Sequence, residues 1–355
     1  MKLELKEYDD DASFFHLTME NIEEDKKVLP CRAYRKTWAE FYGNYVNEVV
    51  VGIKKDDLPE NPKGYELFDK TIEPKLNKKT VKNKINIITF FAESTLELSD
   101  LLSFEDVNLL ADFEQRYNDH LVTLPFTFKF REPVTQTTKI LEDIKNSYSD
   151  FISTIKTSNL LGYVPAYTSF RDLDKFIKLY TDNDLSIKSH FGKLNFVPLM
   201  VDFKNSSPDN YMRSLAKLCN LKKQYLEEGY YLFYYGFSPR NSRVSQKRNI
   251  DETLAKDFLL SYLGFDVIGA SFAQFKKGGA PSETTAAGVF DATDFKYRLQ
   301  VLDTKEYNRV KPRNYTKQTN YLKTISENLG NDSSGAIKEL TKRKEAYEYV
   351  QLYKT

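Results

Sequence analysis

Short apolar runs alternate with longer amphipathic stretches between residues 85 and 270 of this chain. Runs of strand length bounded by turn residues are typical of strands buried on both faces. Between them, apolar residues recur every three or four positions, which is typical of helices. The alternation therefore predicts a parallel sheet whose strands are connected by helices. The predicted strands occupy residues 85–91, 121–128, 161–167, 195–202, 230–235 and 265–269.

Helix-start residues precede two of the amphipathic stretches. Ser169 stands before the stretch at 173–180, and Ser207-Pro208 stands before the stretch at 211–225. A serine hydroxyl accepts a hydrogen bond from an unpaired backbone N–H at a helix start, and proline is favoured at the first helical position. The two serines therefore predict the starts of two connecting helices.

Three further segments are interpreted from capping residues or composition. A polar group at residues 249–252 predicts the start of a helix over residues 254–262, which Gly264 would end. Prolines and lysines dominate residues 56–79, which predicts a long surface insertion. Towards the end of the chain we expect one amphipathic helix over residues 336–353.

The number of alternating units indicates how the sheet is organised. Two more predicted strands, at residues 14–19 and 46–53, raise the count to seven or eight. The expected fold is α/β, a TIM-like (β/α)8 barrel with an N-terminal insertion and a helical C-terminal extension. An open doubly wound sheet is the alternative, although no glycine-rich phosphate-binding turn follows a strand. The expected division is residues 1–84 for the N-terminal strands and insertion, 85–280 for the barrel core, and 281–355 for the basic extension.

Composition excludes several classes of protein. The chain has 355 residues and no apolar run near the ~20 residues that a membrane-spanning helix needs. Two cysteines and three histidines cannot form a disulfide framework or a usual zinc cage, so no metal and no cofactor are expected. The N-terminus lacks the features of a secretion signal. We therefore expect a cytoplasmic protein without a membrane partner.

Charge is unevenly distributed, although the net charge is only +1. The first 25 residues contain two lysines and nine acidic residues, whereas residues 296–355 contain thirteen basic and seven acidic residues. A basic surface of this kind either contacts phosphates or is simply solvated. Both interpretations stay open for the C-terminal part.

Three carboxylates are candidate catalytic groups. Glu93 and Asp202 each follow or end an apolar strand, and the carboxyl ends of barrel strands are where such folds place chemistry. Asp266 interrupts an apolar strand, where a carboxylate is costly to bury without a partner. A capping or surface role is the alternative for Glu93 and Asp202, and a paired structural role is the alternative for Asp266.

A basic loop leaves the predicted strand at residues 230–235. It contains four cations and no acidic residue: Arg240, Arg243, Lys247 and Arg248. Cations of this density contact phosphates in nucleic-acid-binding proteins. The loop is therefore a candidate substrate-binding segment, and a solvated loop is the alternative.

The order of several segments resembles that of the tRNA-guanine transglycosylase family, especially its archaeal branch. The similar segments are FEQRYND (113–119) before LVTLP (121–125), LGYVPAY (161–167) with FRDL (170–173), VPLM (197–200), the run 231–236, and LGFDVI (263–268) with ASFA (270–273). Together they cover residues 85–280. The resemblance implies a barrel that exchanges guanine for a 7-deazaguanine in a nucleic acid. It also implies that Tyr167, Gly236 and Ser271 contact the substrate.

The implied reaction needs two carboxylates. One attacks the anomeric carbon of the ribose, and the other moves the proton of the departing or arriving base. Gly269 stands where the family has its nucleophilic aspartate, and residues 91–95, with Glu93, stand where it has Asp-Ser-Gly. The zinc-binding cysteines of the family are absent from the sequence after Gly279. Glu93 with Asp202 or Asp266 is therefore the predicted catalytic set.

Two hypotheses of different classes follow. The first is an enzyme, a glycosyltransferase that exchanges a purine base in RNA or DNA, with tRNA or DNA and a nucleobase as partners. The second is a catalytically inactive paralogue that binds nucleic acid, a nucleobase or a protein. A homodimer or heterodimer is compatible with both.

Overall fold

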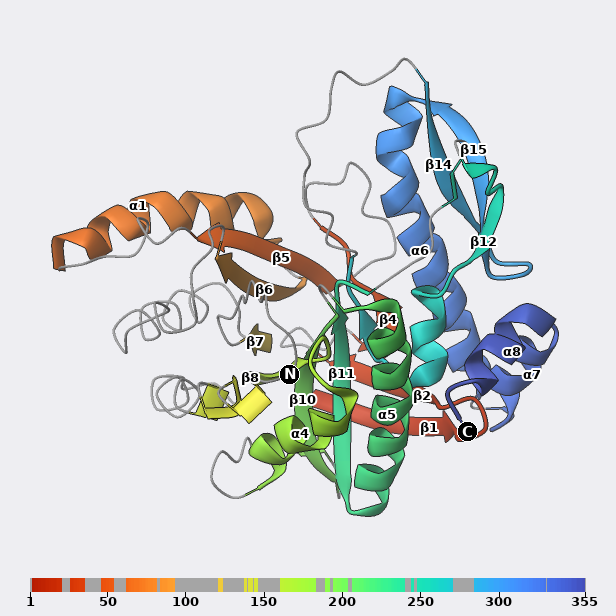
Figure 1. Cartoon of the computed structure of the whole chain (residues 1–355), viewed down its shortest axis with the longest axis horizontal. Helices are drawn as coiled ribbons and strands as arrows, with labels where there is room; N and C mark the ends of the chain where they lie inside the picture. The colour runs from red at the N-terminus through yellow and green to blue at the C-terminus, as the bar shows by residue number, and fades with distance from the viewer. Residues whose placement is uncertain are drawn as a thin grey trace.

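A computed structural model gives the chain a mixed α/β fold (Figure 1). Its largest part is a parallel sheet, which confirms the predicted α/β class. The structure describes residues 2–20, 26–35, 46–53, 62–81, 84–92, 121–123, 137–138, 140–142, 144–145, 160–182, 189–191, 194–203, 206–239, 244–245, 248–270, 284–329 and 331–354.

The main sheet has nine described strands. Eight of them are parallel to their neighbours and follow the order β4-β13-β11-β10-β8-β7-β6-β5, and β9 (Ser189–Phe191) pairs antiparallel with β10. The parallel strands are β4 (Cys31–Arg32), β5 (Val46–Ile53), β6 (Ile85–Ala92), β7 (Leu121–Thr123), β8 (Leu160–Pro165), β10 (Leu194–Asp202), β11 (Tyr230–Phe237) and β13 (Val267–Ile268). The rest of the strand predicted at 121–128 lies outside the described residues.

The segment after β4 also contacts β5, at the other end of this path. Tyr34 and Asn47 form a parallel bridge. The Tyr34 N–H donates to the Val46 carbonyl at 3.0 Å, and the Glu48 N–H donates to the Tyr34 carbonyl at 2.6 Å. The two ends of the strand path are therefore hydrogen-bonded to each other.

The two helices predicted from serine caps are confirmed. α4 (Leu173–Thr181) follows the 3-10 turn η3 (Phe170–Asp172), where the Ser169 hydroxyl accepts from the Arg171 N–H at 3.3 Å. α5 (Pro208–Glu227) begins after Ser207, whose hydroxyl accepts from the Asn210 N–H at 3.2 Å. Both helices bury an apolar face against the sheet, because their apolar residues recur at helical spacing.

Residues 62–79, predicted as part of a surface insertion, form the helix α1 (Pro62–Lys79) instead. Ile72 and Leu76 are buried and lie one turn apart, so they fix one face of the helix. The Lys79 ammonium donates to the Val50 carbonyl of β5 at 2.6 Å. Pro74 lies inside the helix. The high content of proline and lysine is the reason that the sequence did not predict a helix in this segment.

The helix predicted over residues 254–262 is also wrong. Residues Glu252–Leu254 form β12, which pairs antiparallel with β15, and Phe258–Leu263 form the 3-10 helix η6. Every residue of η6 is buried, so this segment has no polar face of the kind that an amphipathic surface helix presents. Gly264 ends the turn with a φ of +86°, as the sequence predicted, because this left-handed backbone conformation favours glycine.

The C-terminal part combines a small sheet with three helices. β14 (Thr284–Asp291) and β15 (Lys296–Asp303) form a hairpin that joins β12, and α6 (Thr304–Leu329) packs beside it (Figure 1). The single helix predicted at 336–353 is divided into α7 (Gly335–Thr341) and α8 (Lys344–Gln351), because the Arg343 backbone between them leaves the helical conformation. The hairpin partner β14 was not predicted.

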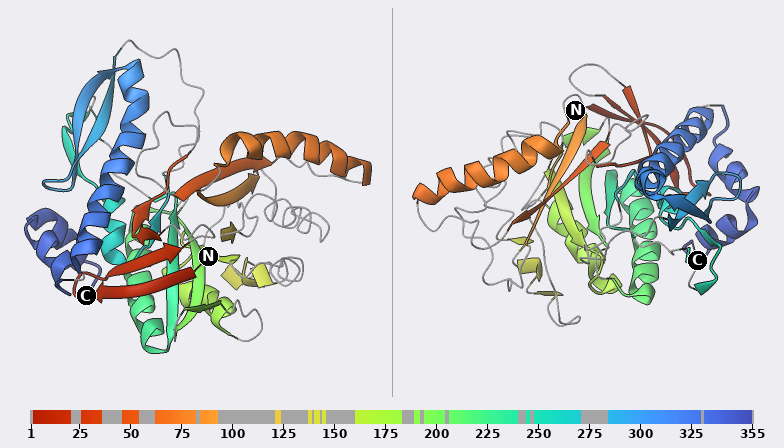
Figure 2. Two further views of the ribbon diagram at one scale, coloured as in Figure 1. Left: turned by 180° about the vertical axis from the view of Figure 1, so that it is seen from behind. Right: turned by 90° about the horizontal axis from the view of Figure 1, so that it is seen from above.

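The N-terminal strands form a separate sheet that packs against the C-terminal helices. The sheet consists of β1 (Lys2–Asp9), β2 (Phe14–Glu20) and β3 (Lys26–Leu29) and crosses close to the lower part of α6 in both views (Figures 1 and 2). The Ser326 hydroxyl of α6 donates to the Leu29 carbonyl at 3.2 Å, and the Ile337 N–H of α7 donates to the Asp9 carboxylate at 2.8 Å. The two ends of the chain therefore stabilise each other.

Candidate functional site

A buried carboxylate on β5, Glu48, is held by a phenol and a guanidinium. Its Oε1 accepts from the Tyr235 hydroxyl of β11, and its Oε2 accepts from Arg35 Nε at 2.8 Å and forms an ion pair with Arg35 Nη2 at 2.8 Å. Glu48 is 2% exposed. Hydrogen bonds in which one partner is charged are shorter and stronger than those between neutral groups, so Arg35 fixes the position of this carboxylate.

A second carboxylate, Asp202, ends β10 as the sequence predicted. It is 6% exposed, and its Oδ2 accepts from the Tyr163 hydroxyl of β8 at 2.8 Å. The Tyr163 and Tyr167 hydroxyls are 3.3 Å apart. Burial, followed by the negative charge of Asp202, raises the pKa of both phenols well above its usual value. Both therefore keep their protons at neutral pH and can donate hydrogen bonds.

Tyr235 donates to Glu48 and points to the same side of the sheet as Asp202. Met200 is the register partner of Tyr235, and Asp202 lies two residues later on the same face of β10. Burial raises the pKa of Tyr235 well above its usual value, and the charges of Glu48 and Asp202 raise it further. We call the residues Arg35, Glu48, Tyr163, Tyr167, Asp202 and Tyr235 the polar cluster.

Gly269 leaves room for the Glu48 carboxylate. A Cβ added at residue 269 would lie 2.7 Å from Glu48 Oε1, 2.8 Å from the Gly236 carbonyl oxygen and 3.1 Å from Tyr235 Cε2. Non-bonded atoms do not approach this closely, so a side chain at 269 would displace its neighbours. The Glu48 carboxylate therefore occupies the space beside Gly269, the position at which the resembled family has an aspartate.

The predicted substrate contacts Tyr167 and Gly236 fall at or beside the polar cluster. Tyr167 is half-buried and contacts Tyr163. A side chain at Gly236 would point away from the polar cluster, because an added Cβ would lie 3.1 Å from the Phe265 ring. The Gly236 carbonyl accepts a hydrogen bond from the Gly269 N–H at 2.8 Å. Gly236 therefore places backbone, not a side chain, at the cluster.

Asp266 lies apart from Asp202. The strand register pairs Asp202 with Phe237, and it pairs Val267 with Tyr235, so Asp266 is level with Tyr234. Along the strands, Asp266 therefore lies three residues before the level of Asp202. At about 3.3 Å per residue this is a displacement of about 10 Å along the strands. The structure therefore does not join these two candidate carboxylates in one group.

Asp266 contacts three buried groups. Its carboxylate accepts from the Lys222 ammonium at 2.8 Å, the Tyr231 hydroxyl at 2.6 Å and the Tyr234 N–H at 2.7 Å. Burial raises the pKa of Asp266, while the Lys222 charge pulls it down, and burial lowers the pKa of Lys222. These contacts agree with the paired structural role that the sequence left open.

Five predicted site residues lie outside the described residues: Glu93, Arg240, Arg243, Lys247 and Ser271. Their predicted roles stay predictions. Arg248, at the end of the basic loop, is described and exposed, and its N–H donates to the Ser245 carbonyl at 3.2 Å.

Metal and membrane features are both missing from the described part of the chain. No three histidine, cysteine, aspartate or glutamate side chains within it are grouped so that they could hold a metal ion. Cys31 and Cys219 are buried and unpaired with each other. None of the described helices is long and apolar enough to span a membrane.

Glu48, Arg35 and Tyr235 were not predicted as site residues from the sequence. A signal for Glu48 existed, because it interrupts the apolar run at residues 46–53 as Asp266 interrupts another. Arg35 and Tyr235 had none, since only the fold brings them to Glu48. With two carboxylates, three phenols and a guanidinium, the polar cluster has the groups that acid–base and nucleophilic chemistry need.

Comparison with known proteins does not place this chain in a family. No family model matches the chain, and no curated protein matches it.

Proposed function

We propose that the eight parallel strands close into a (β/α)8 barrel whose interior holds the polar cluster, with Asp202 at the end of β10 and Glu48 near the start of β5. The strand path follows chain order, and the pairing of Tyr34 with Asn47 supports closure. When the register of each strand pair is extended from Asn47 around the sheet, it reaches the level of position 26 on the line of β4, eight positions before Tyr34. An offset of about eight is the shear of such barrels.

We further propose that this protein exchanges a purine base, guanine or a 7-deazaguanine, at an N-glycosidic bond of RNA or DNA. The observation that carries the proposal is the pair of buried carboxylates, Glu48, which accepts from Tyr235, and Asp202, which lies on the same face of the neighbouring strand. Base exchange at an anomeric carbon needs one carboxylate that stays ionised and one that changes its protonation state. The two carboxylates have different partners, a guanidinium beside Glu48 and a phenol beside Asp202.

We assign the nucleophile to Glu48, whose Oε2 lies 2.8 Å from the Arg35 guanidinium. In the proposed reaction a Glu48 oxygen bonds to the anomeric carbon as the bond from that carbon to the purine nitrogen breaks. Asp202, which accepts from the Tyr163 phenol, donates a proton to the departing base. The incoming base returns its proton to Asp202 as its nitrogen replaces Glu48 at the anomeric carbon. Glu93 stays the predicted alternative to Asp202.

Incorporation of labelled guanine into tRNA and into duplex DNA tests the reaction. We expect wild-type protein to incorporate the label, and Glu48→Gln and Asp202→Asn to lower the rate by about 10²–10⁴-fold, the usual contribution of such groups. Glu252→Gln is the control, since Glu252 is exposed on β12 and belongs to the small C-terminal sheet. Equal rates for all four proteins would reject the assigned roles.

The second candidate is a paralogue that binds nucleic acid without exchanging a base. It is favoured by Tyr235, a fully buried side chain that fills space beside both carboxylates. The test is whether wild-type protein binds tRNA or DNA but incorporates no guanine, with or without a 7-deazaguanine as competitor. That result would support this candidate and reject the enzyme.

A further inference from the structure

Two arginines from different elements are gathered around one aromatic ring. Phe170 and Arg171 belong to η3, and Arg213 belongs to the second turn of α5. The Cζ atoms of Arg171 and Arg213 lie 5.7 Å and 5.5 Å from the centroid of the Phe170 ring. A guanidinium within about 6 Å of a ring centroid is attracted to the ring. Both arginines are exposed and Phe170 is half-buried. We call these three residues the arginine clamp.

The carboxylates nearest to the arginine clamp in the sequence do not neutralise it. Asp172 follows Arg171 directly, but it forms an ion pair with Lys175 at 2.6 Å. Asp209 lies one helical turn before Arg213 on α5, and within the described part of the chain no ion pair joins the two. Among the described residues, the two guanidinium groups therefore have no carboxylate partner.

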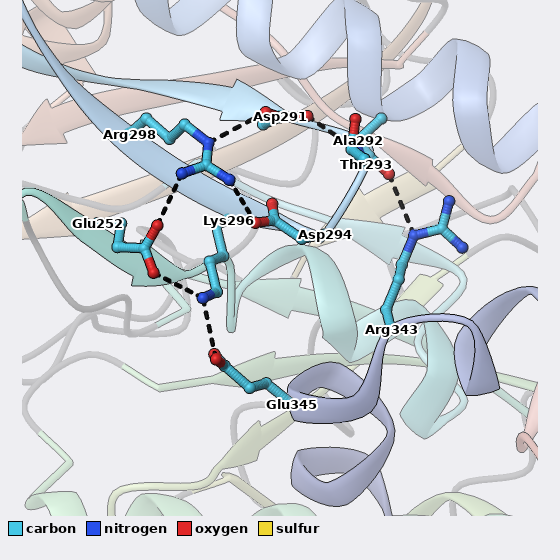
Figure 3. Close-up of polar contacts among 9 residues, drawn as sticks. All are labelled: Glu252, Asp291, Ala292, Thr293, Asp294, Lys296, Arg298, Arg343 and Glu345. Carbon is cyan, nitrogen blue, oxygen red and sulfur yellow. Dashed lines mark hydrogen bonds and ion pairs between the residues drawn. The ribbon is translucent and has the colours of Figure 1, made fainter.

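The C-terminal sheet shows the opposite arrangement. Arg298 of β15 contacts Asp291, Asp294 and Glu252, and Lys296 contacts Glu252 as well (Figure 3). The Arg298 side chain is 45% exposed, so an exposed arginine of this protein can have three carboxylate partners. Exposure alone therefore does not explain why the arginine clamp has none among the described residues.

The arginine clamp lies next to the loop that carries Tyr167 of the polar cluster. Phe170 follows Tyr167 by three residues, so their Cα atoms are at most about 11 Å apart. The Asn210 side chain in the first turn of α5 donates to the carbonyls of Ala166 at 2.9 Å and of Thr168 at 2.7 Å. These hydrogen bonds fix the loop, and with it η3, against the start of the helix that carries the second arginine.

Both elements of the arginine clamp follow the carboxyl ends of neighbouring strands. η3 follows β8, which ends at Pro165, and α5 follows β10, which ends at Asp202. The two strands are parallel, and their register pairs Pro165 with Asp202. The carboxyl ends of β8 and β10 therefore meet at one edge of the sheet, and the segments that leave this edge carry the arginine clamp.

We propose that the arginine clamp binds phosphates of the nucleic acid whose base enters the polar cluster. The identity of this ligand rests on the proposed function. The two Cζ atoms are at most about 11 Å apart, because each lies within about 6 Å of the same ring centroid. A nucleic-acid strand carries one phosphate per about 3.4 Å of helix axis, so both arginines can contact one strand.

The three side chains of the clamp have different tasks. The guanidinium groups donate paired hydrogen bonds to phosphate oxygens, which position a nucleic acid without reading its sequence. Phe170 is a positioning residue, because its ring holds both guanidinium groups beside each other. The clamp thus sets the place of the backbone, while the polar cluster acts on the base.

Binding of labelled tRNA and of labelled duplex DNA, measured over a range of salt concentrations, tests the clamp. The test variant carries Arg171→Gln and Arg213→Gln. Each lost phosphate contact lowers the steepness of log affinity against log salt by about 0.7–0.9, so two contacts lower it by about 1.5. Between about 50 mM and 200 mM salt, wild-type protein should therefore lose about tenfold more affinity than the variant. The nucleic acid whose binding shows this change is the ligand of the clamp.

Two substitutions of Phe170 test the ring. Phe170→Leu keeps an apolar side chain but removes the ring, whereas Phe170→Tyr keeps a ring that attracts cations. We expect the leucine variant to bind the same nucleic acid at least about threefold more weakly than wild type, and the tyrosine variant to bind like wild type. Wild-type affinity in the leucine variant would overturn the positioning role of Phe170.

A control variant with the same change in net charge separates the clamp from general electrostatics. It carries Lys296→Gln and Arg298→Gln, which remove cations that are ion-paired in the C-terminal sheet. We expect this control to keep the wild-type salt dependence. The clamp variant should melt within about 2 °C of wild type, because both arginines are exposed.

The outcomes distinguish this inference from the proposed function. A wild-type salt dependence in the clamp variant, or an equal change in the control, overturns the inference even if wild-type protein exchanges a base. A reduced salt dependence in the clamp variant alone, with no base exchange by wild-type protein, supports the clamp and rejects the exchange reaction. Absence of nucleic-acid binding by wild-type protein rejects both.

Discussion

Replacing Lys222 by methionine tests whether Asp266 is a structural carboxylate. The substitution keeps the length of the side chain but removes the ammonium that contacts Asp266 at 2.8 Å. Both side chains are 2% exposed, so Asp266 would be left in the interior without its cation. Breaking a buried ion pair on one side costs about 3–5 kcal/mol. We expect the free energy of unfolding to fall by that amount.

Urea unfolding at several pH values measures this effect. Without Lys222, burial raises the pKa of Asp266 further, because the main influence that lowers this pKa is lost. The folded state then binds a proton that the unfolded state releases above about pH 4, the ordinary aspartate value. Stability therefore falls as pH rises from that value towards the raised folded pKa. The variant should be closest to wild type near pH 4 and least stable at neutral pH.

The double variant Lys222→Met/Asp266→Asn provides the control. It removes both charges, and replacing both partners of a buried pair is often nearly neutral. We expect it to recover at least half of the lost free energy, with a weaker dependence on pH, while base exchange is retained. A loss below about 1 kcal/mol for Lys222→Met, or loss of exchange in the double variant when folding is normal, would refute the structural role of Asp266.

Two further predictions concern Gly269 and Ser207. Gly269→Ala places a Cβ 2.7 Å from Glu48 Oε1, so guanine incorporation should fall at least about tenfold, whereas Gly335→Ala, with no atom nearer than 3.9 Å, should leave it unchanged. Ser207→Ala removes the acceptor of the Asn210 N–H and should lower the free energy of unfolding by about 1 kcal/mol in urea titrations, with unchanged incorporation. Normal activity of Gly269→Ala, or wild-type stability of Ser207→Ala, would contradict these assignments.

Local sequence signals predicted an element correctly where the residues that stabilise the element lie within it. The strand predicted at residues 46–53 matches β5, because the three consecutive β-branched valines at 49–51 favour a strand without help from another segment. The starts of α4 and α5 follow from serine hydroxyls that bond to their own helices. The position of Asp202 at the end of β10 follows from the same apolar pattern.

Contacts between distant segments account for the wrong predictions. Residues 252–254 became a strand because their backbone pairs with β15, more than forty positions later, and tertiary pairing outweighs a local capping signal. The helix α1 is fixed by two buried residues and by lysine contacts with carbonyls of β5. Neither partner is visible in the segments themselves.

The sequence by itself determined the α/β class, most of the parallel strands and one carboxylate of the candidate site, because apolar periodicity and helix caps act within a few residues. Only the tertiary structure decided which polar groups meet. It brings Glu48 from β5 to Tyr235 of β11, across 187 positions, and assigns Asp266 to Lys222. Such pairs depend on strand order and register, which are set by packing over the whole sheet.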